Sequence, residues 1–180
     1  MKICLAYVGI LALGAAGVAL AQTGGAAATP DWSAWQPLLG EWVGEGGGGP
    51  GEGAGGFTYA ADLQGRVIVR RNFADYPAAN GRPAFSHNDL MVIYQDPSGV
   101  TRADYWDNEG HVIRYGASWS ADGRTLTFVS DPAPGSPRFR LIQALAGARA
   151  DTMAIRFEIA SPARPDSFAT YIEARAHRKN

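Results

Sequence analysis

The sequence predicts an all-β protein: a single antiparallel up-and-down barrel of about ten strands, with a short N-terminal helix closing one end. From Phe57 onward, apolar and polar residues alternate with period two. Turns rich in Gly, Asn, Asp and Pro recur about every 8–12 residues. Neither a second long helical pattern nor an internal repeat is evident, which argues against a propeller. Consecutive hairpins favour closure, because a closed barrel has no exposed strand edges.

Residues 1–21 have the features of a cleaved secretory signal peptide. Lys2 precedes the apolar run from Ile3 to Leu20, and the small residues Ala19 and Ala21 suit a signal peptidase. A membrane anchor is the alternative, because the run is about long enough to span a bilayer. The polar, Gly/Ala-rich residues that follow favour the signal peptide. We therefore expect an exported, periplasmic or extracellular protein with no stable membrane span after cleavage.

The mature chain has no cysteine, because Cys4 lies inside the predicted signal peptide. A packed core must therefore hold the fold together without disulfides. The 16 Lys and Arg residues are balanced by 17 Asp and Glu residues. Without a basic excess to neutralise phosphates, nucleic acid is not expected as a partner. The sequence does not indicate an oligomeric state.

A flexible Gly/Ala-rich leader is expected over residues 22–29, followed by one barrel domain over residues 30–180. Thr29 and Pro30 suit the N-cap and first position of a short helix. Trp32, Trp35 and Leu39 would form its apolar face.

The first strand opens with Gly40-Glu41-Trp42-Val43-Gly44-Glu45-Gly46. A bulky indole between glycines at the start of a strand suits the closed end of a barrel. We predict that Trp42 plugs this floor, while the glycines allow neighbouring backbone to approach closely.

The turn signals delimit the other strands. Gly110 is expected to take the left-handed conformation of a hairpin turn. The expected strands are Phe57–Leu63, Val67–Phe73, His87–Gln95, Val100–Asp107, His111–Trp119, Thr125–Ser130, Arg138–Leu145, Thr152–Ala160 and Ser167–Arg178. A barrel this wide is expected to enclose a cavity.

The last three strands separate into an apolar and a charged face when Leu141 is placed opposite Phe157, and Phe157 opposite Thr170. The apolar face holds Phe139, Leu141, Met153, Ile155, Phe157, Ile159, Phe168 and Ile172, and the charged face holds Arg140, Arg156, Glu158, Tyr171, Glu173 and Arg175. On this register Arg140 meets Glu158, and Arg156 meets Tyr171.

Two interpretations of these faces remain open. The apolar face can line the lumen while the charged face is solvated. Alternatively, part of the charged face points inward, where its ions pair with one another and recognise a carboxylate or another polar head group.

A second polar cluster surrounds the turn after Tyr105-Trp106, with His87 and Asp89 on the preceding strand. Imidazoles beside carboxylates can bind a metal or supply a general base. The alternative is an ordinary polar hairpin tip at the barrel rim. The chain has no His-x-His pair, His-Glu-x-x-His motif or Gly-x-Ser-x-Gly elbow, so we assign neither a metal nor a catalytic residue.

The stretch from Gly40 to Gly46, after Leu38-Leu39, resembles the opening of calycin-type barrels. Its Gly-x-Trp element is similar to that of lipocalins, and it resembles the lipocalin-like barrels of unknown function found in many bacteria. The longer Gly-x-Trp-x-Gly-x-Gly is similar to the nitrobindin group, ten-stranded barrels that bind haem. Nitrobindins end in a strand with a haem-ligating histidine, in a context like His-Leu-x-Ala-x-Leu-Arg. Here Tyr171 stands at that position, and tyrosine can ligate haem iron.

The favoured hypothesis is an exported barrel, a binding protein rather than an enzyme, that holds a small, mostly apolar molecule in its lumen and needs no cofactor. A haem- or tetrapyrrole-binding barrel with Tyr171 as ligand is one alternative. An enzyme that uses a rim cluster of His87, Asp107, Glu109 and His111 is another. The candidate ligand-binding residues are Trp42, Tyr59, Met91, Arg140, Arg156, Phe157, Glu158 and Tyr171.

Overall fold

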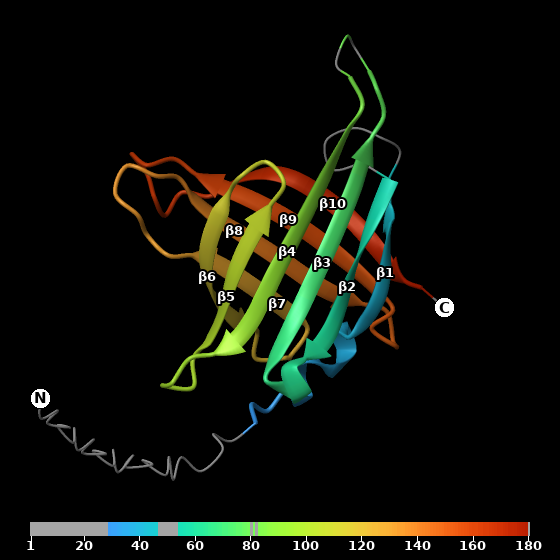
Figure 1. Ribbon diagram of the computed structural model, residues 1–180, viewed down its shortest axis with the longest axis vertical. Helices are drawn as coiled ribbons and strands as arrows, with labels where there is room; N and C mark the ends of the chain where they lie inside the picture. The colour runs from blue at the N-terminus through green and yellow to red at the C-terminus, as the bar shows by residue number, and fades with distance from the viewer. Residues whose placement is uncertain (1–28, 47–53, 80, 82, 180) are drawn as a thin grey trace, which may run out of the picture.

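The computed structural model describes residues 29–46, 54–79, 81 and 83–179. The predicted signal peptide and all of the predicted leader except Thr29 lie outside these residues. Ten strands form a closed antiparallel barrel (Figure 1), in which each strand pairs with its neighbours in sequence and β1 pairs with β10. The predicted fold class is confirmed.

The elements follow the predicted order closely. They are η1 (Ser33–Leu38), β1 (Gly40–Glu45), β2 (Ala54–Asp62), η2 (Leu63–Gly65), β3 (Val67–Tyr76), β4 (Phe85–Gln95), β5 (Thr101–Asp107), β6 (Val112–Trp119), β7 (Thr125–Ser130), β8 (Arg138–Ala146), β9 (Thr152–Ala160) and β10 (Ala169–Arg178). Gly110 has a φ of 94°, the left-handed conformation that was predicted for this turn. The hairpin of β3 and β4 projects beyond the rest of the upper rim (Figure 1).

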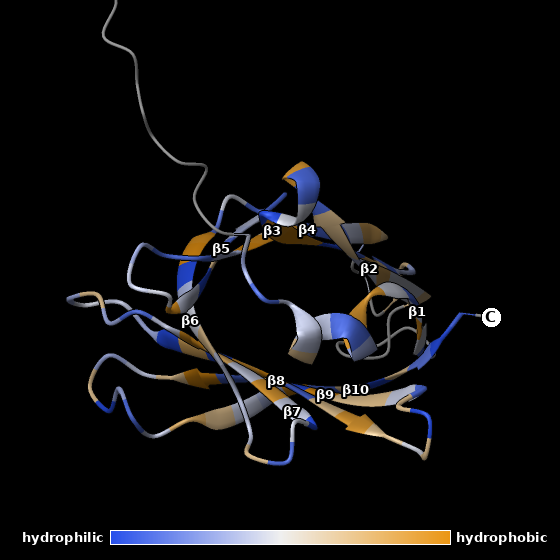
Figure 2. Ribbon diagram, turned by 90° about the horizontal axis from the view of Figure 1, so that it is seen from below, coloured by the Kyte–Doolittle hydropathy of each residue, from blue (hydrophilic) through white to orange (hydrophobic). Residues whose placement is uncertain are grey.

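The N-terminal helix is a 3₁₀-helix that starts at Ser33, later than the sequence predicted. Asp31 accepts a hydrogen bond from the Ser33 amide at 2.9 Å, and Pro37 lacks the N–H that a longer α-helix would need. Because a 3₁₀-helix repeats every three residues, its buried face carries Trp32, Trp35 and Leu38 rather than Leu39. Figure 2 shows η1 lying across the lower end of the barrel.

Aromatic contacts fasten this helix to the barrel floor. The Trp35 ring packs edge-on against Trp119 and Phe128, with centroid separations of 5.7 and 6.2 Å. The Trp32 indole donates a hydrogen bond to the carbonyl of Gly65 in η2 at 2.8 Å. The helix therefore closes this end, as predicted.

Trp42 has the plugging role that the sequence predicted. Its side chain is fully buried, and its Nε1 donates to the Leu38 carbonyl at 2.9 Å. The Arg178 guanidinium lies 4.6 Å from the Trp42 ring centroid, and its Nη1 donates to the Leu39 carbonyl at 2.6 Å. Close backbone approach occurs at Gly56 of β2, where a Cβ would lie 2.4 Å from the Trp42 carbonyl oxygen.

The register of the last strands is partly as predicted. Leu141 faces Phe157 and Arg140 faces Glu158. The prediction that Phe157 faces Thr170 is wrong, because a bulge between Thr170 and Ile172 contains Tyr171 as an extra residue.

This bulge also changes the partner of Arg156. Phe157 pairs with Ile172, and Arg156 faces Glu173 instead of Tyr171. The extra residue on β10 shifts the register of the two strands, so both predicted pairs are wrong.

Candidate functional site

The polar side chains of the lumen meet between the aromatic floor and the upper rim. At their centre Arg70 of β3 and Asp89 of β4 form an ion pair, with 2.5 Å between Nη1 and Oδ1. Both side chains are buried, with 7% and 5% of their surface exposed. Strand alternation places Arg70 on the same inward face as Ile68, and Asp89 on the same face as Met91.

The neighbouring carboxylate favours the charged form of Arg70. Burial by itself would lower the pKa of Arg70, but the neighbouring Asp89 outweighs burial and raises it. The second oxygen of Asp89 accepts a hydrogen bond from Asn72 Nδ2 at 2.9 Å. The same oxygen lies 3.4 Å from His87 Nε2. Asp89 therefore joins the buried ion pair to the residues of the rim.

A hydrogen bond crosses the lumen next to this pair. Tyr59 Oη of β2 donates to Gln143 Oε1 of β8 at 2.6 Å. Around the barrel, three strands separate β2 from β8 in one direction and five in the other, so the bond joins opposite walls. Burial raises the pKa of Tyr59 to about 12, so the phenol remains a donor at neutral pH.

Several buried donors on the inner wall have no partner in the described structure. They are Nε of Arg70, Nε2 of Gln143 and Nε1 of Trp119. Each of these groups can donate a hydrogen bond but not accept one. Leaving such a group unsatisfied costs about 1–3 kcal/mol. The wall therefore offers unused hydrogen-bonding capacity to an acceptor in the lumen.

The predicted rim residues come together at the mouth of the barrel. His87 Nδ1 lies 2.7 Å from Glu109 Oε1, and His111 Nδ1 lies 2.8 Å from Asp107 Oδ2. Tyr105 links the two pairs: its Oη lies 3.3 Å from His87 Nε2 and donates to Asp107 Oδ2 at 3.1 Å. The four residues of the enzyme hypothesis thus share one mouth.

Part of this cluster also shapes the turn. Asp107 Oδ1 accepts hydrogen bonds from the backbone amides of Glu109 and His111 at 3.0 and 2.9 Å. This is the ordinary role that the alternative interpretation expected of a polar hairpin tip. Burial opposes ionisation of Asp107, but the hydrogen bonds from His111 and Tyr105 outweigh it and lower its pKa.

His87 is positively charged at neutral pH. One ring nitrogen faces the Glu109 carboxylate, and the other faces Tyr105 Oη, whose own proton is directed to Asp107. Both nitrogens must therefore donate, which requires the imidazolium form. Hydrogen bonding to Asp89, opposed by burial and reinforced by Glu109, raises the pKa of His87 to about 9.

The predicted ligand-binding residues fall into two groups. Trp42, Tyr59 and Met91 are buried in the lumen, and Phe157 faces inward with Met153 on its strand. The charged residues Arg140, Arg156 and Glu158 alternate with these positions and lie on the outer wall.

These outer residues pair with one another. Arg156 Nε lies 3.0 Å from Glu158 Oε1, and Arg140 contacts the other oxygen of the same carboxylate. The inward-facing interpretation of the charged face is therefore incorrect for these three residues.

Tyr171 is 64% exposed at the bulge of β10, with its ring edge against Phe157. Its phenol is not among the buried side chains of the lumen.

Sequence reasoning missed Arg70, Asn72 and Gln143 as site residues, although a signal was present. Arg70 and Asn72 continue the period-two face that begins with the buried Ile68. Gln143 stands between Leu141 and Leu145 on the apolar face of its strand. A polar residue in an inward-facing series identifies such a site.

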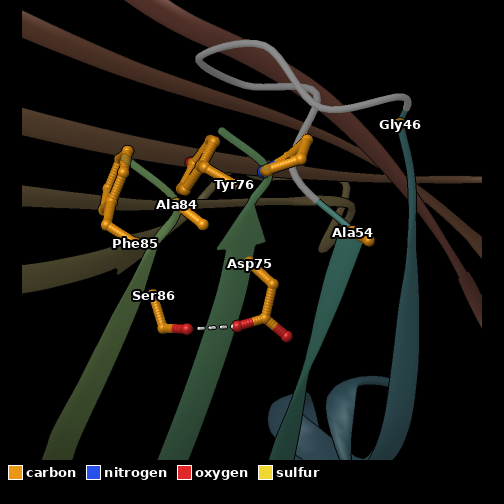
Figure 3. A pocket seen from close by; sticks show the side chains of 8 residues that line it. Gly46, Ala54, Asp75, Tyr76, Ala84, Phe85 and Ser86 are labelled. Atoms are coloured by element: carbon orange, nitrogen blue, oxygen red, sulfur yellow. Dashed lines mark hydrogen bonds between the residues drawn. The ribbon is translucent and has the colours of Figure 1, made fainter. Parts of the chain in front are cut away.

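The hollows of the described surface include one beside the β3–β4 hairpin and one over β4, β5 and β6. A hollow of about 600 Å³ lies beside the projecting hairpin, where Ser86 donates to Asp75 at 2.5 Å (Figure 3). Two of its lining residues, Gly46 and Ala54, flank residues 47–53, which are not described, and we assign it no role. A smaller hollow of about 390 Å³ lies over polar side chains that include Tyr94, Asp96, Arg102, Asp104, Arg114 and Asp131.

Within residues 29–46, 54–79, 81 and 83–179, no group of three or more His, Cys, Asp and Glu side chains is placed to hold a metal ion. The helices in these ranges are too short or too polar to cross a membrane. No protein-family model and no curated protein matches the chain. The molecule is thus defined by its architecture, a closed ten-stranded antiparallel barrel consistent with a calycin-like fold.

Proposed function

We propose that this chain is an exported barrel that binds a small, mostly apolar molecule through the open end of its lumen. The observation that carries the proposal is the buried Arg70–Asp89 pair, with unsatisfied donors beside it, on a wall that is otherwise largely apolar. Apolar side chains of similar volume would usually stabilise a fold at least as well as a buried ion pair. A ligand that uses these groups gives a reason for their presence.

The closed floor leaves the rim as the route of entry. A ligand would pass His87 and Glu109, whose side chains are 24% and 50% exposed. Phe57, Met91 and Tyr115 are inward-facing apolar side chains that are buried in the core of the barrel. An apolar wall with a few convergent polar groups is typical of small-molecule sites.

Export is proposed from the apolar run of residues 3–20 and the small residues before Gln22. N-terminal sequencing of the protein recovered outside the cytoplasm should begin at Gln22. An intact Met1 on the recovered protein would contradict the proposal.

A neutral apolar dye, 1-N-phenylnaphthylamine, tests the lumen as the binding site. We expect saturable fluorescence enhancement with one dye per chain. Met91→Trp and Ala117→Leu add volume to the inner wall and should each weaken dye binding about tenfold or more. Ile142→Trp on the outer wall is the matched control. Binding that is unchanged in folded inner-wall variants would place the dye elsewhere, and a dye that does not bind would count against the proposal.

The convergence of His87, Tyr105 and Asp107 favours an enzyme as a second candidate. An imidazolium with a pKa of about 9 suits a general acid at neutral pH. Incubation with a small-molecule extract, followed by mass spectrometry, would show substrates consumed by the parent protein. His87→Gln should abolish any such turnover and His177→Gln on β10 should not. Equal turnover in both variants would exclude the rim mechanism.

A further inference from the structure

We infer that the ligand of the lumen is neutral and presents a hydrogen-bond acceptor, such as a ketone, ester or amide carbonyl, and that the site discriminates against anions. This inference depends on the proposed binding function and specifies the chemical class of the ligand.

The first argument comes from the unpaired donors. Arg70 Nε and Gln143 Nε2 are buried and have no hydrogen-bond partner among the described residues. Both residues adjoin Tyr59: Arg70 is paired with it across strands β2 and β3, and Gln143 accepts its hydrogen bond. The Tyr59 hydroxyl already donates its proton to the Gln143 oxygen. A ligand that brought only another hydrogen-bond donor would therefore leave the N–H groups of Arg70 Nε and Gln143 Nε2 unsatisfied. The complementary ligand atom is therefore an acceptor.

The second argument comes from charge. Around the Arg70–Asp89 pair and at the mouth, away from Arg178 on the floor, two cations, Arg70 and His87, face the three carboxylates of Asp89, Asp107 and Glu109. These five charges sum to −1.

An anion beside Arg70 or His87 would find both of these positive charges already paired. Arg70 is already paired with Asp89, and His87 lies between Asp89 and Glu109. Burying an uncompensated carboxylate is far more costly than burying a hydrogen-bonded carbonyl. The acceptor is therefore neutral.

Three probes of matched chain length test this discrimination: 2-undecanone, methyl decanoate and sodium decanoate. Binding is followed at pH 7 by the fluorescence of the buried tryptophans of the lumen. We expect the ketone and the ester to bind about tenfold or more tightly than decanoate. Equal or tighter binding of decanoate would overturn the inference while leaving the proposed binding function intact.

Two variants test the residues responsible. Gln143→Leu removes one unpaired donor and should weaken ketone binding about fivefold or more, with little effect on the binding of undecane, which has no acceptor. Asp89→Asn leaves the Arg70 charge unpaired and should raise the affinity for decanoate relative to the ketone about tenfold or more. Glu158→Gln, on the outer wall, is the matched control.

If Asp89→Asn does not fold, Glu109→Gln removes a carboxylate at the more exposed mouth and should shift the preference in the same direction. A preference for the ketone that none of the inner-wall variants changes would contradict the assignment.

If none of the three probes binds, the charge of any molecule that copurifies decides: a neutral acceptor supports the inference, and an anion overturns it. If no small molecule binds at all, the proposed function itself fails.

Discussion

At the scale of single residues, the main feature is an ion pair buried in the lumen. Arg70 and Asp89 are each more than nine-tenths buried, so removing one partner leaves an uncompensated charge. Replacing both with apolar residues avoids this penalty. Single and double variants therefore separate the cost of an orphaned charge from the contribution of the pair.

We predict that Asp89→Ala lowers the free energy of unfolding by about 3–5 kcal/mol. The double variant Arg70→Met with Asp89→Leu should be close to the parent protein, within about 1–2 kcal/mol. Urea denaturation measures both. If the double variant is less stable than the single variant, the pair contributes to stability rather than to binding.

His87 makes stability depend on pH. Its pKa rises from the ordinary 6.5 to about 9 in the folded protein, so the folded state binds more protons than the unfolded chain between these values. Stability is therefore greatest below about pH 6.5 with respect to this group and falls as the pH rises through about 9.

We expect this loss to be about 3 kcal/mol in the parent protein and to be absent from His87→Gln. Urea denaturation across this pH range gives the two curves. His177→Gln, on the outer side of β10, should keep the dependence of the parent. Parallel curves for the parent and His87→Gln would mean that the imidazole is not held as a cation.

The exposure of Tyr171 leads to a prediction about haem. Because its phenol is exposed at a bulge, we expect haemin to give the same Soret band with the parent protein and with Tyr171→Phe. A band that shifts on binding and is lost only in the variant would restore Tyr171 as an iron ligand.

The partners of individual side chains were the hardest feature of the structure to predict from the sequence. The inward series of Ile68, Arg70 and Asn72 is visible as alternation, yet the partner of Arg70 lies on another strand and depends on register. The bulge at Tyr171 has no glycine to mark it. The one-residue change of register at this bulge arises where β10 packs against β9, and the local sequence does not encode it.

At the scale of elements, the first and last strands are fastened around Trp42. Arg178 stacks on the indole and donates to carbonyls of Pro37 and Leu39, which join η1 to β1. One side chain near the end of the chain thus holds the helix that closes the floor. The sequence predicted the plug but not this clamp, because the two residues are far apart in the chain.

Arg178→Ala should lower the free energy of unfolding by about 2–3 kcal/mol, since it removes two hydrogen bonds of a charged group and a cation–π contact. Arg178→Lys should recover part of this loss. Arg175→Ala, an exposed position on the same strand, is the control and should change stability by less than about 0.5 kcal/mol. Equal effects at both positions would argue against the clamp.

The helix shows why element type is harder to predict than element position. Trp32 and Trp35 suit both a period of three and a period of 3.6, and the next buried residue, Leu38 or Leu39, decides between them. Pro37 and the early hydrogen bond of Asp31 favour the short 3₁₀ form. The position of the element followed from sequence, whereas its type was decided by the burial of Leu38 rather than Leu39.

At the scale of the whole molecule, the barrel is closed below by aromatic side chains and carries polar groups toward its mouth. Strand number and order followed from turns and alternation, because each strand pairs with its neighbours in sequence. The outward position of Arg140, Arg156 and Glu158 also followed from alternation once the lumenal face was known. The cross-lumen bond from Tyr59 to Gln143 joins residues 84 positions apart and needed the closed structure to be found.

The central claim is that the polar groups of this lumen serve a small molecule. Native mass spectrometry of the protein, purified without unfolding, tests it most directly when compared with the mass of the denatured chain. We predict an excess mass of one small molecule per chain that is lost on denaturation, absent from Arg70→Met with Asp89→Leu, and retained in Arg140→Met with Glu158→Leu. Identical native and denatured masses, together with no binding of the neutral probes, would contradict the claim.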